Sequence, residues 1–192
     1  GHDNLATMMK FDDRQQNMQE QLKLDPFTGL NNKKTFDDYL PRLMEECRNA
    51  QKFLSLAMID IDHFKSVNDL YGHAMGDRVI LYLSQTLQKL QNENIRAFRI
   101  GGDEFALLFK GCSTEETRKI CEYLRTQMVS CPLRNTDDKR VTLSCGVVSI
   151  DPENADLEML KNAADSALYA AKDNGRDQVV IYNELVPSPE SC

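Results

Sequence analysis

Two adjacent carboxylates follow two glycines in the stretch 101–104, Gly-Gly-Asp-Glu. The stretch lies between two short apolar segments, 95–100 and 105–109, so it falls where a β-hairpin is expected to turn. Glycine allows a positive φ and lets a ligand approach the backbone closely. Adjacent acids repel each other and contribute no packing, whereas a hard cation with a phosphate ligand explains them. The tip therefore predicts a metal and phosphate site, although Gly-Gly-Asp is also ordinary turn chemistry.

A third acid, Asp60, is expected at the end of a strand, because residues 53–61 are nearly continuously apolar, as in a central strand covered on both faces. If this strand and the hairpin are neighbours in one sheet, Asp60, Asp103 and Glu104 converge at one edge. Such oxygen ligands suit Mg²⁺, with substrate phosphates completing the shell. The alternative for Asp60 alone is a strand-end residue that caps the following loop.

The composition predicts one domain with a short appendage in 192 residues. Charged residues make up 28% and hydrophobic residues 41%, without a long apolar window, so we expect a soluble segment that makes no membrane contact. The net charge of -7 argues against nucleic acid as the main partner. The six cysteines show no C-x-x-C pairing, and no signal peptide is present, which predicts reduced thiols in a cytoplasm.

Helices and strands are expected to alternate around the central hairpin, which favours an α+β or mixed α/β sheet with helices packed on it. Residues 3–24 fit a helical period too loosely to indicate a coiled coil. A helix is predicted at 33–50, with Pro41 bending or restarting it, and another is expected to start from an N-cap at Asp77. A capping box at Ser113 predicts a third helix, and a fourth is predicted over 157–171, ended by Gly175. Strands are predicted at 141–150 and 179–182.

Five motifs in a consistent order resemble the GGDEF family of diguanylate cyclases. They are Asp-Pro-Phe-Thr-Gly-Leu-Asn at 25–31, residues 60–69, residues 71–77, the Gly-Gly-Asp-Glu-Phe at 101–105, and Ala-Lys-Asp-Asn-Gly-Arg at 171–176. Each motif alone is weak, but their order and spacing together are specific. The resemblance runs from about Asp25 to Tyr182.

The resemblance implies a palm-like fold with a largely antiparallel central sheet, and condensation of two GTP into cyclic di-GMP with release of two pyrophosphates. Each subunit of a head-to-head homodimer, transient or driven by a sensor, would hold one GTP, and the 3′-hydroxyl of one would attack the α-phosphate of the other. We expect residues 1–24 to be an N-terminal helical connector fragment with a tag remnant, 25–183 the cyclase domain and 184–192 a flexible tail. An upstream sensor domain is expected to have been removed, and the location is expected to be cytoplasmic, or the cytoplasmic part of a larger, membrane-anchored bacterial receptor.

The resemblance also assigns roles to residues. The metal, Mg²⁺ or alternatively Mn²⁺, is assigned to Asp60, the Ile61 carbonyl, Asp103 and Glu104. Either Asp103 or Glu104 would help deprotonate the hydroxyl, and Lys65 would neutralise charge in the transition state. Substrate contacts are assigned to the following residues: His63, Phe64, Asn68, His73, Asp77, Gly101, Gly102, Lys172 and Arg176.

Some of these assignments have ordinary alternatives. The Asp77 carboxylate can accept hydrogen bonds from guanine N1-H and N2-H, which favours GTP over ATP, or it can simply be a helix N-cap. Lys172 and Arg176 can bind phosphates or complement a helix dipole. His73 can line the guanine pocket or be solvated. Asp177 stands where the family frequently has Asn.

Other functions remain open at this point. Residues 92–95, Asn-Glu-Asn-Ile, stand where product-inhibited family members usually carry Arg-x-x-Asp, so that inhibitory site is expected to be missing. The alternative to an active cyclase is a catalytically weak module that binds GTP or cyclic di-GMP and signals through a partner, but retention of the turn acids favours catalysis. A polymerase-like or adenylyl-type cyclase is disfavoured by Asn68 and Asp77.

Overall fold

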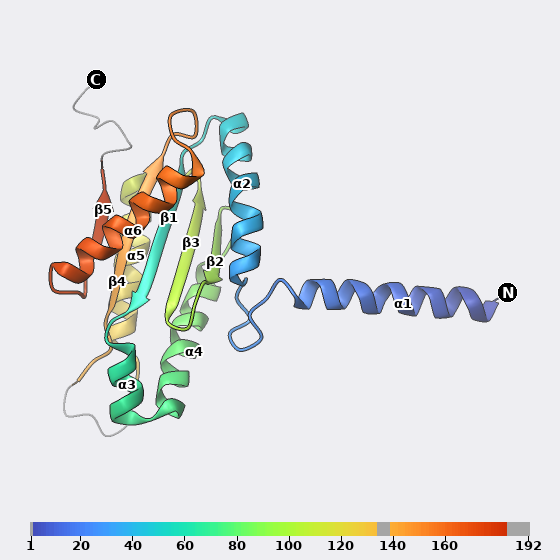
Figure 1. The fold of residues 1–192 in the computed structure, drawn as a ribbon, viewed down its shortest axis with the longest axis horizontal. Coiled ribbons are helices and arrows are strands. Elements are labelled where there is room, and N and C mark those ends of the chain that lie inside the picture. The colour runs from blue at the N-terminus through green and yellow to red at the C-terminus, as the bar shows by residue number, and fades with distance from the viewer. Residues whose placement is uncertain (1, 134–138, 184–192) are drawn as a thin grey trace.

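A computed structural model describes residues 2–133 and 139–183. Its elements in chain order are α1 (His2–Gln21), α2 (Lys33–Ala50), β1 (Leu54–Ile61), α3 (Phe64–Tyr71), α4 (His73–Leu90), β2 (Ile95–Arg99), β3 (Glu104–Lys110), α5 (Thr114–Val129), β4 (Leu143–Ile150), α6 (Leu157–Asp173) and β5 (Val179–Tyr182). In Figure 1 the strands form one sheet with helices packed on it, and α1 projects away from this body.

The sheet has the order β2-β3-β1-β4-β5, with β1 in the centre. Every neighbouring pair is antiparallel except β4 and β5, which are parallel. This confirms the predicted α+β fold with a largely antiparallel sheet. The register of β1 against β3 places Asp60 directly opposite Glu104.

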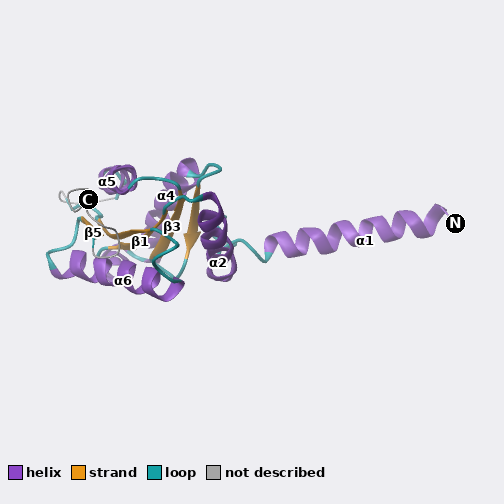
Figure 2. Cartoon of the chain, turned by 90° about the horizontal axis from the view of Figure 1, so that it is seen from above, coloured by secondary structure: helices purple, strands orange, loops and turns teal. Residues whose placement is uncertain are grey.

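Helices cover both faces of the sheet, and Figure 2 shows α5 and α6 on opposite sides of it. Ala57, Ile59 and Ile61 of β1 belong to the core under α4 and α5, whereas Leu54, Leu56 and Met58 belong to the core under α2 and α6. Because side chains alternate along a strand, Asp60 lies on the face that α6 covers.

The chain brings α6 unusually close to that face through a glycine in β4. A Cβ atom placed on Gly146 would lie 2.2 Å from the backbone nitrogen of Leu168. Any larger residue would therefore push α6 away from the sheet. The close contact fixes the height of α6 above the strand that carries Asp60.

Several boundaries differ from the sequence-based expectation. α2 runs without interruption through Pro41, starting at the N-cap Asn32, whose side chain accepts a hydrogen bond from the backbone of Thr35. The helix expected to begin after Asp77 begins at His73, so the N-cap assignment for Asp77 was wrong. Helix α3 was not predicted, because its eight residues were taken as part of an irregular break.

Other predicted features are confirmed. Ser113 and Glu116 form the expected capping box at the start of α5. The last strand has the predicted bounds, Val179–Tyr182, while β4 begins at Leu143, two residues later than expected.

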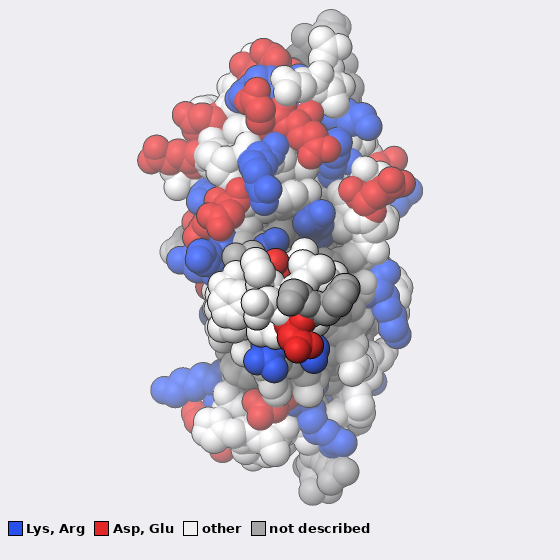
Figure 3. Space-filling view, turned by 90° about the vertical axis from the view of Figure 1, so that its right-hand side faces the viewer, with Lys and Arg blue, Asp and Glu red and all other residues white. Residues whose placement is uncertain are grey.

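The described side chains of α1, residues 3–18, are exposed, including the apolar Leu5, Met8, Phe11 and Met18. Figure 3 looks toward the end of α1, and on that face acidic and basic side chains are interspersed rather than gathered by sign. Among the described residues, no helix combines the length and the apolar character that a membrane span requires. The predicted tail, 184–192, lies outside the described residues.

Candidate active site

The acids at the end of β1 and at the β2–β3 turn lie together at one edge of the sheet. Asp60 pairs with Glu104 across the strands, and the backbone N–H of Ile61 donates to the carbonyl of Asp103 at 3.2 Å. The side chains of Asp60 and Glu104 share the face covered by α6, since both continue the alternation of the apolar residues beside them. The fold thus gathers the three carboxylates from two segments far apart in the sequence.

The Asp60 carboxylate is the most unusual group in this cluster. Its side chain is 14% exposed, its Oδ2 forms an ion pair with Nζ of Lys172 on α6, and its Oδ1 is buried with no hydrogen-bond partner among the described residues. Burial raises the pKa of Asp60 to about 6; the bond from Lys172 lowers it, and the adjacent Asp103 raises it. A buried, unpaired carboxylate oxygen calls for an explanation, and a cation ligand is one.

Glu104 shares this environment. Burial raises the pKa of Glu104, and the negative charge of Asp60 raises it further, while Lys172 lowers it. A carboxylate whose pKa is shifted toward neutrality is better suited to accept a proton than an ordinary one. Its position therefore permits acid–base chemistry at the edge of the cluster.

The turn itself is held by Arg99 at the end of β2. Its Nε donates to the carbonyl of Gly101 at 3.1 Å and its Nη2 to the carbonyl of Gly102 at 2.8 Å. Neither glycine adopts a positive φ, so this turn does not use the conformational freedom that glycine offers. A Cβ on Gly102 would meet nothing within 4 Å. The space beside the turn is open, which leaves room for a ligand to approach the backbone.

Arg99 also connects the turn to the start of the domain. Its Nη1 pairs with Oδ2 of Asp25 at 3.1 Å, and that oxygen accepts hydrogen bonds from the backbone and hydroxyl of Thr28 at 2.9 and 2.7 Å. Burial raises the pKa of Asp25, but the hydrogen bonds from Thr28 and Arg99 outweigh it, and the net pKa is lowered. Arg99 therefore connects Asp25, in the segment that follows α1, to the backbone carbonyls of the Gly-Gly turn.

The residues assigned to the nucleotide base and to some phosphates lie on α3 and α4. His63 precedes α3 with a φ of 54°, Lys65 is exposed in its first turn, and Phe64 is half-buried against the core. His73 and Asp77 are exposed on α4. These residues form a second group, on elements separate from the acid cluster.

Asn68 on α3 lies in contact distance of α4. A Cβ on Gly76 would come within 1.8 Å of the Asn68 Oδ1 atom. Only glycine at position 76 lets the Asn68 amide occupy this place between the two helices. The contact gives Gly76 a positioning role that the sequence did not reveal.

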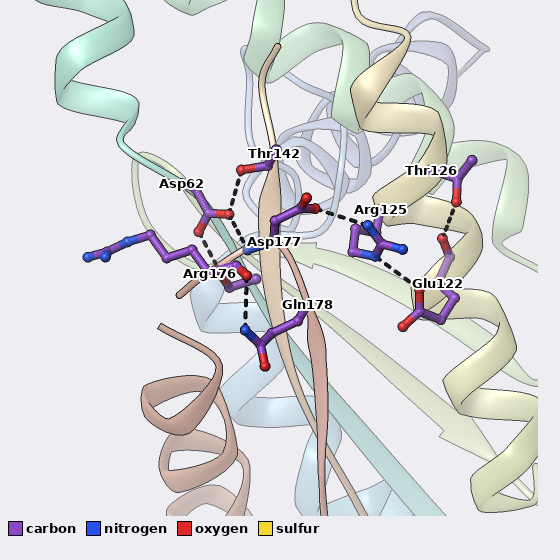
Figure 4. Close-up of polar contacts among 9 residues, drawn as sticks. Asp62, Glu122, Arg125, Thr126, Thr142, Arg176, Asp177 and Gln178 are labelled. Atoms are coloured by element: carbon purple, nitrogen blue, oxygen red, sulfur yellow. Dashed lines mark hydrogen bonds and ion pairs between the residues drawn. The ribbon is translucent and has the colours of Figure 1, made fainter. Parts of the chain in front are cut away.

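Lys172 and Arg176 lie near the end of α6, and the loop beyond it is anchored by Asp62. Asp62 is 6% exposed, and its carboxylate accepts hydrogen bonds from the hydroxyls of Thr142 at 2.8 Å and Ser144 at 2.7 Å, and from the backbone N–H of Asp177 at 3.0 Å (Figure 4). Asp62 was missed as an anchor, because its partners lie 80 or more positions away in the chain.

Together, the fold and the site define an α+β domain with a carboxylate cluster at the edge of an antiparallel sheet. A sequence profile described as "Diguanylate cyclase, GGDEF domain" matches residues 22–178. The chain therefore belongs to the GGDEF domain family.

Relatives and solved structures agree with this assignment. Diguanylate cyclase VdcA of Vibrio cholerae is 35% identical over 167 residues, which cover 85% of this chain and 48% of VdcA. The coiled coil and GGDEF domain of DgcB from Caulobacter crescentus, solved in complex with c-di-GMP, superposes with a TM-score of 0.86 at 32% identity, covering 94% of this chain and 96% of that one. The diguanylate cyclase SiaD of Pseudomonas aeruginosa, solved with its activator SiaC, gives a TM-score of 0.77 at 31% identity, covering 93% and 72%. The chain spans about half the length of curated relatives such as VdcA.

Proposed function

We propose that the chain is a diguanylate cyclase that condenses two GTP molecules into cyclic di-GMP and two pyrophosphates. The observation that carries this proposal is the convergence of Asp60, Asp103 and Glu104 beside Lys172. Carboxylates that bind a metal ion, next to cations that bind phosphates, are the parts that phosphoryl transfer needs. Membership of the GGDEF family favours this reaction over others that use the same parts.

The residues of the cluster fit a divalent cation. Asp60 offers a buried oxygen without a partner, and Asp103 lies next to it. Mg²⁺ or Mn²⁺ would be held by Asp60, Asp103, the Ile61 carbonyl and substrate phosphates, with Glu104 beside them. Within the described residues, no three His, Cys, Asp or Glu side chains form a ready-made metal cluster by themselves. When bound, such an ion would neutralise negative charge on the phosphates.

The remaining roles follow from position and chemistry. Glu104 or Asp103 accepts the proton of the attacking 3′-hydroxyl, and the raised pKa of Glu104 suits it to this step. The start of α3, with Lys65 and the backbone N–H groups of His63 and Phe64, offers positive potential to phosphates. Lys172 and Arg176 approach the phosphates from the end of α6.

Guanine is proposed to bind between α3 and α4. The Asn68 amide offers both a donor and an acceptor, and the exposed Asp77 carboxylate accepts two N–H groups that guanine has and adenine lacks. Adenine lacks these N–H groups, so ATP would not gain the hydrogen bonds that GTP makes here. The base is therefore read by a different part of the molecule from the part that performs the chemistry.

The reaction needs two half-sites, so the proposed partner is a second copy of this chain. The apolar side chains Leu5, Met8, Phe11 and Met18 of α1 are exposed in the single chain and offer a surface that a second copy could cover, although their period alone is too loose to indicate a coiled coil. DgcB, whose solved segment includes a coiled coil, matches 94% of this chain, which supports pairing through α1. Because the chain covers about half of relatives such as VdcA, an upstream sensor domain is also proposed.

The test is incubation of the purified chain with GTP and Mg²⁺ and identification of the product by mass. We expect cyclic di-GMP from GTP and none from ATP, with a rate that rises faster than linearly with enzyme concentration if pairing is weak. Asp103→Ala should abolish product. Glu158→Ala, an exposed acid at the opposite end of α6 from Lys172, is the control and should leave the rate unchanged.

Other outcomes would separate the alternatives. Tight GTP binding without product, at any enzyme concentration, would indicate the weakly catalytic binding module. Equal product from Asp103→Ala and the unmodified chain would show that the metal and base assignments are wrong.

A further inference from the structure

The loop between α6 and β5 has an unusual backbone. Gly175, Arg176 and Asp177 have φ values of 111°, 64° and 48°, so three consecutive residues lie in the left-handed region. Side chains at Arg176 and Asp177 make this conformation unfavourable, and it persists only where surrounding contacts impose it. Arg176 is one of the proposed phosphate-binding cations. The contacts that hold the loop in this conformation therefore affect how Arg176 meets the substrate.

Part of the support comes from the sheet and from the loop itself. The N–H of Arg176 donates to the carbonyl of Ala171 at 2.9 Å, and Nε2 of Gln178 donates to the carbonyl of Arg176 at 3.0 Å. The N–H of Asp177 donates to the buried carboxylate of Asp62 at 3.0 Å. These contacts fix the backbone on both sides of the Arg176 side chain.

The remaining support comes from α5, on the other side of the sheet. Nη1 of Arg125 pairs with Oδ1 of Asp177 at 3.1 Å, and Nε of Arg125 pairs with Glu122 one turn earlier at 2.9 Å. Figure 4 shows Arg125 approaching Asp177 from α5, while the guanidinium of Arg176 extends away from both. Arg125 and Arg176 thus lie on opposite sides of the turn, and Arg125 can act on a ligand of Arg176 only through the turn.

The charges around Asp177 explain why this pair matters. Two acids, Asp177 and Glu122, share the guanidinium of Arg125, and the carboxylate of Asp62 accepts the backbone N–H of Asp177. Without Arg125, the carboxylates of Asp177 and Glu122 would lose the cation between them and repel each other. A neutral amide at position 177 would not create this repulsion.

We propose that Arg125 is a positioning residue that neutralises Asp177 and so holds Arg176 in the orientation that binds the nucleotide phosphates. This proposal rests on the proposed function, because it takes a guanosine triphosphate as the ligand of Arg176. The Arg125 and Asp177 side chains are 29% and 42% exposed, so the pair is partly screened. We therefore expect an effect of about threefold to tenfold on nucleotide binding.

The experiment compares Arg125→Met with Arg118→Met. Arg118 is on the same helix and pairs with an acid at the same spacing, Glu115, and among the described residues it makes no hydrogen bond or ion pair with the loop, so it is a matched control. Binding of a non-hydrolysable GTP analogue is measured by calorimetry and turnover by steady-state kinetics. Arg125→Met should raise Kd and KM by about threefold to tenfold and change kcat by less than about twofold, and Arg118→Met should change neither.

Two further variants test the route of the effect. In an Asp177→Asn background, Arg125→Met should no longer weaken binding, since there is no charge left to neutralise. In an Arg176→Met background it should also have no further effect, because the two substitutions act on one contact. Additive losses in either background, or unchanged binding by Arg125→Met alone, would overturn the proposal.

Hydrogen exchange at the Asp177 amide separates this inference from the proposed function. Exchange should be faster in Arg125→Met than in Arg118→Met, without any nucleotide present. If the unmodified chain makes no cyclic di-GMP, the proposed function fails. Hydrogen exchange at the Asp177 amide and binding of the GTP analogue would still test the role of Arg125. Equal exchange rates at the Asp177 amide in Arg125→Met and Arg118→Met would contradict the positioning role, even if the chain is an active cyclase.

Discussion

Asp60 and Asp62 lie two positions apart at the end of one strand, but their surroundings are opposite. Asp62 has three hydrogen-bond donors around its carboxylate, from two hydroxyls and one backbone N–H. Asp60 has an ion pair on one oxygen and, within the described residues, no hydrogen-bond partner on the other, which is buried. Two identical side chains thus differ in their bonding: Asp62 ties distant segments together, whereas one buried oxygen of Asp60 is left without a hydrogen-bond partner among the described residues.

The difference has an energetic side. A buried acceptor without a partner costs free energy that a satisfied one does not. Asp60 also lies beside Asp103 and opposite Glu104, which adds repulsion between carboxylates. The region around Asp60 is therefore expected to oppose folding, and the region around Asp62 to support it.

The largest expected effect is on turnover, from Asp60→Asn. Replacing a proposed metal ligand by a neutral amide should reduce cyclic di-GMP formation by roughly a hundredfold or more, a loss typical of removing a group that stabilises the transition state. The free energy of unfolding should stay the same or rise, because the repulsion with Asp103 disappears. Product formation and urea denaturation measure the two quantities. A variant that is inactive because it is unfolded would contradict the contrast between the two acids.

Asp62→Ala should have the reverse signature, with a large effect on stability. It leaves the hydroxyls of Thr142 and Ser144 and the N–H of Asp177 without their acceptor, so the free energy of unfolding should fall by about 2–4 kcal/mol. Urea denaturation of this variant beside Asp60→Asn gives the comparison directly. A stability equal to that of the unmodified chain would mean that water replaces the carboxylate without cost.

The sequence predicted one of these acids and not the other for a physical reason. Asp60 follows a strand whose burial on both faces is visible as an apolar run, and the acids of the hairpin turn indicate a shared edge. The role of Asp62 depends on Thr142 and Asp177, which are 80 and 115 positions away, so no local pattern reveals it.

The lack of a distinctive local sequence pattern also explains the wrong predictions around α3 and α4. Gly72 separates the two helices with a φ of 89°, and in the sequence it resembled the middle of an irregular segment. Asp77 has the residue type of an N-cap, but the helix had already begun one turn earlier. Helix ends are set by backbone geometry that several residue types can satisfy, whereas the strands were found because their burial leaves a pattern.

The pH dependence of stability sharpens the comparison further. In the metal-free protein the pKa of Asp60 is raised from 3.8 to about 6, chiefly by burial. The folded state therefore holds this proton more tightly than the unfolded state, and ionising Asp60 between pH 3.8 and about 6 destabilises the fold. The stability gained from protonated Asp60 is fully present below pH 3.8 and is lost above about pH 6.

Asp60→Asn removes this titration, so its stability relative to the unmodified chain should increase as the pH rises from about 4 to 7. Urea denaturation in the presence of a chelator, at several pH values, measures the difference. A difference that is constant across this range would show that Asp60 is not buried against its neighbours as described.

The smallest expected effect comes from Thr142→Val, which removes a single donor from Asp62 and keeps the side-chain shape. Two donors remain, so the free energy of unfolding should fall by about 0.5–1.5 kcal/mol, and turnover should change by less than about twofold. Thr126→Val is the control, since Thr126 is exposed and its hydroxyl, among the described residues, donates to the carbonyl of Glu122 within its own helix. If Thr142→Val proved as damaging as Asp62→Ala, the anchor would depend on that one hydroxyl. A loss that is only a fraction of the Asp62→Ala effect would instead show that all three donors, from residues 142–144 and from Asp177, contribute to the stability of this anchor.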